Sequence, residues 1–253
     1  MCLILFSHQN HPTYRLVVAA NRDEFYRRPT EVAKFWKDQP TVLAGQDVEA
    51  GGTWMGLSKS GRFSMLTNYR DPQNIQSSAP SRGRLVSNYL INEKDPESYL
   101  QEIEEAGQRY NGFNLICGSR DDLYYYGNYQ SGVHRVNPGT HGLSNALLDT
   151  PWPKVIKGKA KLDQVLQKEV IDIESLFALL FDDVKADESD LPDTGVGLEH
   201  EKMLSPVFIK SPNYGTRCST AVLITHANEI LFAERTYDIN DFSSSTVSFQ
   251  FKA

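Results

Sequence analysis

The residues best suited to chemistry lie at the two ends of an expected hairpin near the start of the chain. Cys2 precedes the apolar run 3–6, and a second apolar run, 16–20, leads into the polar tetrad 21–24, Asn-Arg-Asp-Glu. Two β-rich runs around a turn-rich link predict a hairpin, which brings the start of one strand beside the end of its partner. We therefore expect Cys2 to lie next to the tetrad, as a nucleophile beside its activators.

Cys2 could act as a nucleophile that carries its own base. Methionine before a small residue is commonly removed, and the exposed α-amine, with a pKa of about 8, is a competent base at neutral pH. A thiol needs less activation than a hydroxyl because it ionises more readily. The alternative is that Cys2 is a small buried residue that opens a core strand.

The tetrad supplies charges that could activate such a thiol. The guanidinium of Arg22 would stabilise a thiolate, and the carboxylate of Asp23 or Glu24 would orient the amine. Alternation along a strand puts Asn21 and Asp23 on one face of the sheet. Arg22 and Glu24 then share the other face, and either face could meet Cys2. The alternative for the whole tetrad is a turn with a solvated salt bridge.

Three further polar residues stand at the ends of expected strands. Asn68 lies at the end of the strand predicted over 62–69, and Asn145 ends the strand predicted over 139–145. Their amide N–H groups could hold a developing oxyanion, worth about 3–4 kcal/mol when well placed. Turn formation or capping is the alternative for both asparagines. Arg217 starts a late strand, where a surface salt bridge is its alternative role.

Length, composition and net charge limit the classes of protein to which this chain can belong. The chain has 253 residues, of which 40% are hydrophobic and 23% are charged, and its net charge is -6. The length fits one large domain over 1–253, or two small ones, and is enough to bury a sizeable core. The negative charge argues against a general nucleic-acid binder, because such proteins present a basic face to phosphates. No apolar run approaches the roughly 20 residues of a membrane helix.

The cysteine content and the start of the chain indicate in which cellular compartment the protein resides. The cysteines are Cys2, Cys117 and Cys218, an odd and sparse set that implies no disulfide framework. The opening apolar run lacks the basic residues that precede it in a secretory signal. We therefore expect a reduced, cytoplasmic protein, in which a reactive Cys2 would stay available.

No pattern indicates a cofactor or a metal. His8 and His11 have a spacing compatible with a metal, but no carboxylate or thiol partner is evident, and His200 lacks the second histidine of a zinc protease. A glycine-rich phosphate loop and a dinucleotide fingerprint are both absent from the sequence. We expect a protein without a cofactor or metal.

The expected elements come in blocks of strands and helices without strict alternation. This order argues against a doubly wound parallel sheet and predicts an α+β layered fold with antiparallel strands. Residues 30–50 are expected to be an irregular excursion, 182–201 an acidic surface loop, and 119–122 a turn. The expected strands are 53–57, 62–69, 113–118, 123–126, 133–136, 139–145, 208–211, 216–226, 230–235 and 246–251, with helices at 81–92, from 95 onward, 151–168 and 171–181.

Several motifs together resemble the NRDE family over essentially the whole chain. They are Met1-Cys2, Ala20-Asn21-Arg22-Asp23-Glu24, Gly51-Gly52-Thr53-Trp54-Met55-Gly56, Thr67-Asn68-Tyr69, Gly142-Leu143-Ser144-Asn145 and Tyr214-Gly215-Thr216-Arg217-Cys218-Ser219-Thr220. The resemblance implies an N-terminal nucleophile hydrolase fold, a four-layer αββα sandwich of two mostly antiparallel sheets.

The pattern is also similar to choloylglycine hydrolases and penicillin V acylases. The catalytic residues that this similarity implies are, in chain order, Cys2, Arg22, Asp23, Asn68, Asn145 and Arg217. Those acylases place two residues between the early arginine and aspartate, whereas Arg22 and Asp23 are adjacent. Glu24 therefore stays an alternative for the acid.

We expect a cysteine hydrolase that cleaves a linear amide or related acyl bond of a small molecule, once Met1 is removed. The competing hypothesis is a non-catalytic binding or trafficking protein for haem or an acyl-coenzyme A type ligand, because a fold does not determine function. Substrate and oligomeric state stay open.

Overall fold

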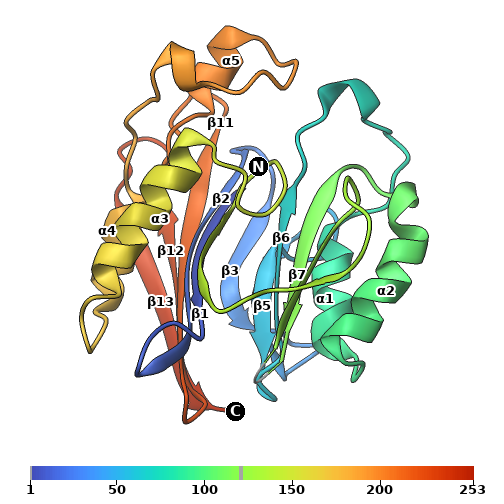
Figure 1. Ribbon diagram of the computed structural model, residues 1–253, viewed down its shortest axis with the longest axis vertical. Helices are drawn as coiled ribbons and strands as arrows, with labels where there is room; N and C mark the ends of the chain where they lie inside the picture. Colours follow the sequence, from blue (N-terminus) through green and yellow to red (C-terminus); the bar gives the residue numbers. More distant parts are fainter. Residues whose placement is uncertain (1, 120–121) are drawn as a thin grey trace.

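The computed structural model describes residues 2–119 and 122–253, which form two antiparallel sheets stacked between helices (Figure 1). In this part of the chain the first sheet has six strands, in spatial order β10 (Gly139–Leu143), β1 (Cys2–His8), β2 (Tyr14–Phe25), β11 (Tyr214–Thr225), β12 (Glu229–Tyr237) and β13 (Ser244–Lys252). The second has seven, in spatial order β3 (Thr30–Phe35), β4 (Val42–Asp47), β5 (Met55–Ser58), β6 (Phe63–Asn68), β7 (Phe113–Gly118), β8 (Leu123–Gly127) and β9 (His134–Arg135).

Helices cover the outer face of each sheet, which gives four layers (Figure 1). The first sheet is covered by α3 (Pro153–Val165) and α4 (Ile173–Leu180), the second by α1 (Gly83–Ile91) and α2 (Pro96–Ala106). A short helix, α5 (Leu198–Met203), lies above the first sheet in this view, and 3-10 turns occupy Pro72–Asn74, Gly107–Arg109 and Glu188–Asp190. None of the described helices has both the length and the apolar character needed to cross a bilayer.

The strand β1 shows how the sequence builds this sandwich. Leu3 and Leu5 pack toward the helices of the first sheet, whereas Ile4 and Phe6 pack between the two sheets. Successive side chains of a strand point to opposite faces, and both faces of β1 are covered, so the run 3–6 is apolar throughout. A third apolar layer joins the second sheet to α1 and α2. The predicted αββα sandwich is confirmed.

Three local predictions need correction or completion. Residues 30–50 contain β3 and β4; β3 is an edge strand with mostly exposed side chains, so it lacks the buried alternation that indicates a strand. The stretch 182–201 is largely irregular, but it includes the start of α5. The strand expected at 208–211 is a single bridge between Lys210 and Gly215. Met1 and the middle of the turn expected at 119–122 lie outside the described residues.

Candidate functional site

The hairpin of β1 and β2 brings Cys2 to the polar tetrad, as predicted. Cys2 begins β1 and lies directly opposite Arg22 of β2. Directly opposed residues of an antiparallel pair point to the same face, so Cys2 and Arg22 share the face that meets the second sheet. Asn21 and Asp23 point to the side of the helices. Cys2 therefore shares the face of the sheet that carries Arg22 and Glu24, and not the face that carries Asn21 and Asp23.

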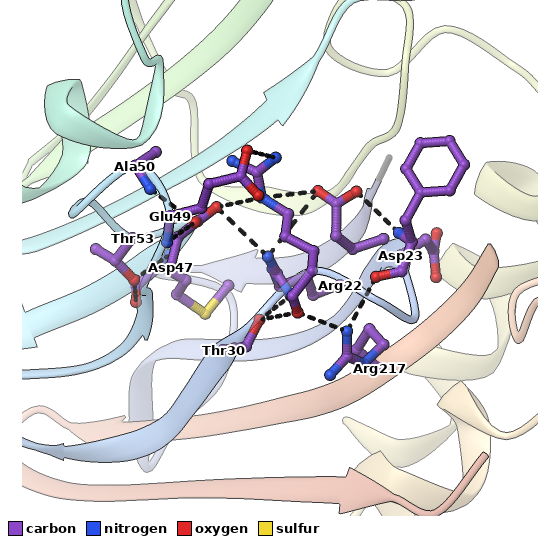
Figure 2. A network of polar contacts seen from close by, with 12 residues as sticks. Arg22, Asp23, Thr30, Asp47, Glu49, Ala50, Thr53 and Arg217 are labelled. Carbon is purple, nitrogen blue, oxygen red and sulfur yellow. Dashed lines mark hydrogen bonds and ion pairs between the residues drawn. The ribbon is translucent and has the colours of Figure 1, made fainter. Parts of the chain in front are cut away.

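Polar contacts hold the Arg22 side chain in place (Figure 2). Its side chain is 5% exposed, and its Nη1 donates to Oγ1 of Thr30 at 3.0 Å. The guanidinium lies 4.3 Å from the centroid of the Trp54 ring. Its Nη2 is 3.7 Å from Asp47 and 3.9 Å from Glu24. Four separate contacts thus keep a cation next to the thiol.

The Cys2 thiol is nevertheless harder to ionise than an ordinary cysteine. Burial raises its pKa, and the negative charge of Asp23 raises it further. The positive charge of the amino terminus, the charge of Arg22 and the backbone N–H of Asp23 act in the opposite direction and lower the pKa. Because the raising effects are larger, the thiol stays protonated at neutral pH, and a nearby base has to accept its proton.

Asp23, rather than Glu24, is the acid whose charge acts on the Cys2 thiol. Asp23 is 1% exposed, and its Oδ1 accepts a hydrogen bond from Oγ1 of Thr216 at 2.7 Å. The hydroxyl of Tyr214 donates to the Asp23 carbonyl at 3.0 Å. Glu24 instead stands at the rim with a partly exposed side chain, where its Oε1 accepts from the N–H of Phe25 at 2.8 Å.

Asn21 holds distant parts of the chain together and does not face the thiol. Its Nδ2 donates to the carbonyls of Leu180 at 3.0 Å and Val207 at 2.8 Å. Its Oδ1 accepts a hydrogen bond from Oγ of Ser219 at 2.5 Å. These three bonds saturate the buried amide, so Asn21 attaches the end of α4 to the first sheet.

The two asparagines predicted as an oxyanion pair lie together but play different parts. Asn68 lines the same cavity as Cys2. Asn145 is 1% exposed, and its Nδ2 donates to the backbone carbonyl of Asn68 at 2.8 Å. Ser144 donates from Oγ to the Cys2 carbonyl at 3.2 Å. Asn145 therefore positions Asn68, whose own side chain borders the cavity.

Arg217 is the extra residue of a β-bulge opposite the tetrad. The pairing of β11 with β2 shifts between Thr216 and Cys218, and the residue between them stays unpaired. Nη1 of Arg217 donates to the carbonyls of Phe25, Tyr26 and Arg28, each at 3.0 Å. Figure 2 shows its side chain directed at this turn. Arg217 thus fixes the turn that follows β2 and presents Arg28 to the cleft.

Cys2 opens into a cleft with two connected compartments. The compartment at Cys2 has a volume of about 410 Å³ and a mainly polar wall that includes Asp47. The neighbouring compartment has a volume of about 600 Å³. Its apolar wall comprises Phe25, Tyr69, Pro72, Ile75, Val196, Met203, Leu204 and Tyr214. The residues that line both compartments are Glu24, Arg28, Asn68, Arg82 and Asn111.

The sequence of the chain matches a known family. A family model described as Transport and Golgi organisation 2 matches residues 1–239 of the chain. The chain belongs to the Transport and Golgi organisation 2 family. The NRDE resemblance is thereby confirmed, because NRDE is another name for this family.

Relatives in the Transport and Golgi organisation 2 family match along nearly their whole length. The Homo sapiens homolog is 40% identical over 264 residues, which cover 96% of this chain and 95% of that protein. The Mus musculus homolog is 37% identical over 273 residues, which cover 98% of this chain and 99% of that protein. The Drosophila melanogaster protein is 27% identical over 268 residues, which cover 93% of this chain and 92% of that protein.

Solved structures of two hydrolases have a similar fold. The C2A mutant of conjugated bile acid hydrolase from Clostridium perfringens aligns with a TM-score of 0.53 at 10% identity, covering 100% of this chain and 97% of that one. The Caenorhabditis elegans ortholog of N-acylethanolamine-hydrolyzing acid amidase aligns with a TM-score of 0.51 at 11% identity, covering 88% and 92%. At such identities the likeness shows the fold alone, that of the N-terminal nucleophile hydrolases.

The sequence patterns did not single out several charged groups around the site, among them Arg28, Asp47, Arg82 and Lys154. Arg82 lines both compartments, but it stands just before a helix in a context that gives no signal. Lys154 is 3% exposed in the first turn of α3. A signal for it did exist, because Lys154, Gly158 and Leu162 recur at the spacing of one buried helix face.

The histidines singled out in the sequence have other partners. The ring of His11 bonds through Nε2 to the Lys168 carbonyl at 2.9 Å. His200 lies in the wall of the apolar compartment. Within residues 2–119 and 122–253, no group of three or more His, Cys, Asp or Glu side chains is arranged to hold a metal ion.

Proposed function

We propose that this protein is an N-terminal cysteine hydrolase that cleaves a linear amide or related acyl bond of a small molecule. One observation carries the proposal: Cys2 heads an interior strand and lines a cleft whose wall also holds Asn68 and the buried Asp23. A thiol, a carboxylate and an amide donor around one cavity are the groups that acyl transfer requires.

The reaction uses the α-amine that removal of Met1 leaves on Cys2. The amine accepts the thiol proton, and the sulfur attacks the carbonyl carbon to form a tetrahedral oxyanion. The side-chain N–H of Asn68 stabilises this oxyanion. When the C–N bond breaks, the ammonium returns its proton to the leaving amine. Water then attacks the thioester, with the same amine as base, and releases the acid and the free thiol.

The remaining predicted residues support these steps. Asp23 orients the ammonium and balances its charge, and Arg22 stabilises the thiolate. Asn145 acts through Asn68, whose strand it holds in place. Arg217 acts through the turn that carries Arg28 into the cleft wall. The apolar compartment would take the acyl group, because its wall is largely aromatic and aliphatic.

Two measurements on the purified protein test this function. Intact mass should show the loss of Met1 and the addition of a thiol-reactive acyl probe at Cys2. A panel of N-acyl amides should then be turned over by the wild type and not by Cys2→Ala. Cys117→Ala is the matched control, because Cys117 is fully buried and away from the cleft. Retained Met1 together with an unlabelled Cys2 would rule the proposal out.

The second candidate function is a non-catalytic carrier for haem or an acyl-coenzyme A type ligand. The size and apolar wall of the 600 Å³ compartment support it, as do the relatives, which are named for transport and Golgi organisation. A carrier should bind its ligand equally well after Cys2→Ala and release it unchanged. Titration with haem, followed by absorbance, tests that ligand, and an unshifted Soret band would exclude it.

A further inference from the structure

Arginines line the wall of the cleft, and most of them are paired with carboxylates. Nη2 of Arg22 lies 3.7 Å from Oδ2 of Asp47, a contact that Figure 2 shows. Nε of Arg28 lies 2.7 Å from the same oxygen. Arg70, which lines the apolar compartment, pairs through Nη1 with Oε2 of Glu201 in α5 at 2.5 Å. The charges of these three arginines are thus balanced within the protein.

Arg82 differs from the other arginines of the cleft. It lines both compartments, and its Nη1 donates to the carbonyl of Gly112 at 2.8 Å. Within residues 2–119 and 122–253, no carboxylate forms an ion pair with its guanidinium. A guanidinium carries five N–H donors in a fixed fork. Most of the donors of Arg82 are therefore available to a molecule in the cleft.

The backbone and the side chain of Arg82 are both held in place. Arg82 directly precedes Gly83, the first residue of α1, and the N–H of Thr53 donates to the Gly83 carbonyl at 3.2 Å. Gly52 packs so closely against this helix start that an added Cβ would lie 2.4 Å from the carbonyl carbon of Gly83. The bond to Gly112 fixes the other end of the side chain. A group held in this way loses little freedom when a ligand binds to it.

The surroundings of Arg82 favour the binding of one negative charge. Burial lowers the pKa of Arg82, because its partly desolvated charge has no contacting carboxylate. A carboxylate on a ligand could accept two parallel N–H bonds from the guanidinium fork. The carboxylates of Glu24, Asp47 and Glu49 belong to the same wall and would repel any further negative charge. A ligand with a single negative charge therefore fits best.

Asn68 and Arg82 stand at the junction of the cleft, since each lines both compartments. The side-chain amide of Asn68 donates to no acceptor in the part of the chain that the structure describes. The junction thus offers a neutral donor and a cationic donor to the same ligand. An amide carbonyl suits the first donor, and an anionic group suits the second.

We propose that Arg82 is a specificity-determining residue, whose guanidinium binds the single carboxylate of a ligand at this junction. The ligand class is an acyl compound that carries one carboxylate on the amine side of its amide bond, with the acyl group in the apolar compartment. The proposal deepens the function above and rests on it for the scissile carbonyl at Asn68. The contact between Arg82 and the carboxylate requires no reaction.

The test compares two ligands that differ in charge alone, N-dodecanoylglycine and its neutral amide, N-dodecanoylglycinamide. Calorimetric titration of the Cys2→Ala protein measures their binding without turnover. The acid should bind about tenfold more tightly than the amide, or better. Adding Arg82→Gln should remove this preference, although the glutamine amide can still donate to Gly112. Arg84→Gln is the matched control, because Arg84 is exposed on the same helix and lines neither compartment.

These outcomes are separate from those of the proposed function. An acid that binds no better than the amide, or a preference that survives Arg82→Gln, overturns the proposal even if the wild type hydrolyses amides. A preference that is lost in Arg82→Gln and kept in Arg84→Gln upholds it even if no amide is hydrolysed.

A third ligand tests the number of charges. Dodecyl phosphate carries close to two negative charges at neutral pH and should bind more weakly than N-dodecanoylglycine, because the carboxylates of the wall repel the second charge. Tighter binding of the phosphate would overturn the assignment of a single carboxylate. Should Arg82→Gln fail to fold, Arg82→Met provides the same comparison.

Discussion

Asn145 and Asn68 are joined by a hydrogen bond of 2.8 Å from the side-chain Nδ2 of one to the backbone carbonyl of the other. Asn145 follows β10 of the first sheet, and Asn68 ends β6 of the second. The bond therefore connects the two sheets at the cleft. Ser144, next in the chain, binds the Cys2 carbonyl at 3.2 Å. One short segment thus positions both the nucleophile strand and the Asn68 strand.

Replacement of Asn145 should therefore cost more stability than replacement of Asn68. Asn145→Ala leaves the partly buried carbonyl of Asn68 without its donor, which costs about 1–3 kcal/mol. Asn68→Ala removes a side chain that borders the cleft, so we expect less than about 1 kcal/mol of stability loss but a large loss of Cys2 acylation. Urea unfolding of both variants measures the difference. Equal losses of stability in the two variants would show that the hydrogen bond between the sheets contributes no more to stability than the Asn68 side chain does.

Asp23 and Glu24 offer a matched test of which acid serves Cys2. Asp23→Asn should slow acylation of Cys2 on the order of 10²-fold or more, because the amide cannot carry the charge that orients an ammonium. Glu24→Gln should change the rate less than about tenfold, since Glu24 stands at the rim of the cleft. Mass spectrometry of the acylated protein against time gives both rates. A larger effect at Glu24 would reverse the assignment.

A buried carboxyl behind the site predicts a pH effect on stability. Glu234 is 1% exposed; its Oε1 accepts from the N–H of Ala33 at 2.7 Å, and its Oε2 lies 3.7 Å from Sγ of Cys218. Burial raises its pKa from 4.5 to about 7. Between these values the folded protein holds a proton that the unfolded chain has released, so stability falls as pH rises through this window.

Glu234→Gln should flatten that dependence. The wild type should lose on the order of 3 kcal/mol of unfolding free energy through this group as pH rises from below 4.5 to above 7. The glutamine variant lacks the ionisable group and should lose less over the same range. Urea unfolding at several pH values gives both curves, and parallel curves would contradict the assignment.

The Arg70–Glu201 pair should be strongly cooperative. Each side chain is less than a tenth exposed, so removal of one partner leaves a buried charge and should cost about 3–5 kcal/mol. The double replacement Arg70→Met with Glu201→Leu should cost less than the sum of the single changes. A double-mutant cycle in urea measures this coupling. Limited proteolysis should meanwhile cut near α5 faster in the single variants than in the wild type.

The parts of the fold that sequence predicted are those set by local patterns. The register of Cys2 with Arg22 follows from two apolar runs and a turn. The contacts of Asn21 with Leu180 and Val207 span 159 and 186 residues, and no local pattern carries such information. The same applies to the bulge at Arg217, because an unpaired residue depends on the neighbouring strand. These side chains were named as candidates by type, but their partners required the structure.

The direction of the strands bears on how this protein should be handled. Each strand from β1 through β2, β11 and β12 to β13 runs antiparallel to its neighbour. The chain therefore leaves β13 at the edge of the sheet opposite to Cys2, and Figure 1 shows the carboxyl end far from α5. Under the proposed function, a purification tag or fluorescent label joined ahead of Met1 would keep the nitrogen of Cys2 in a peptide bond and block the reaction. The same label joined after Ala253 would leave the start of the chain open to removal of Met1.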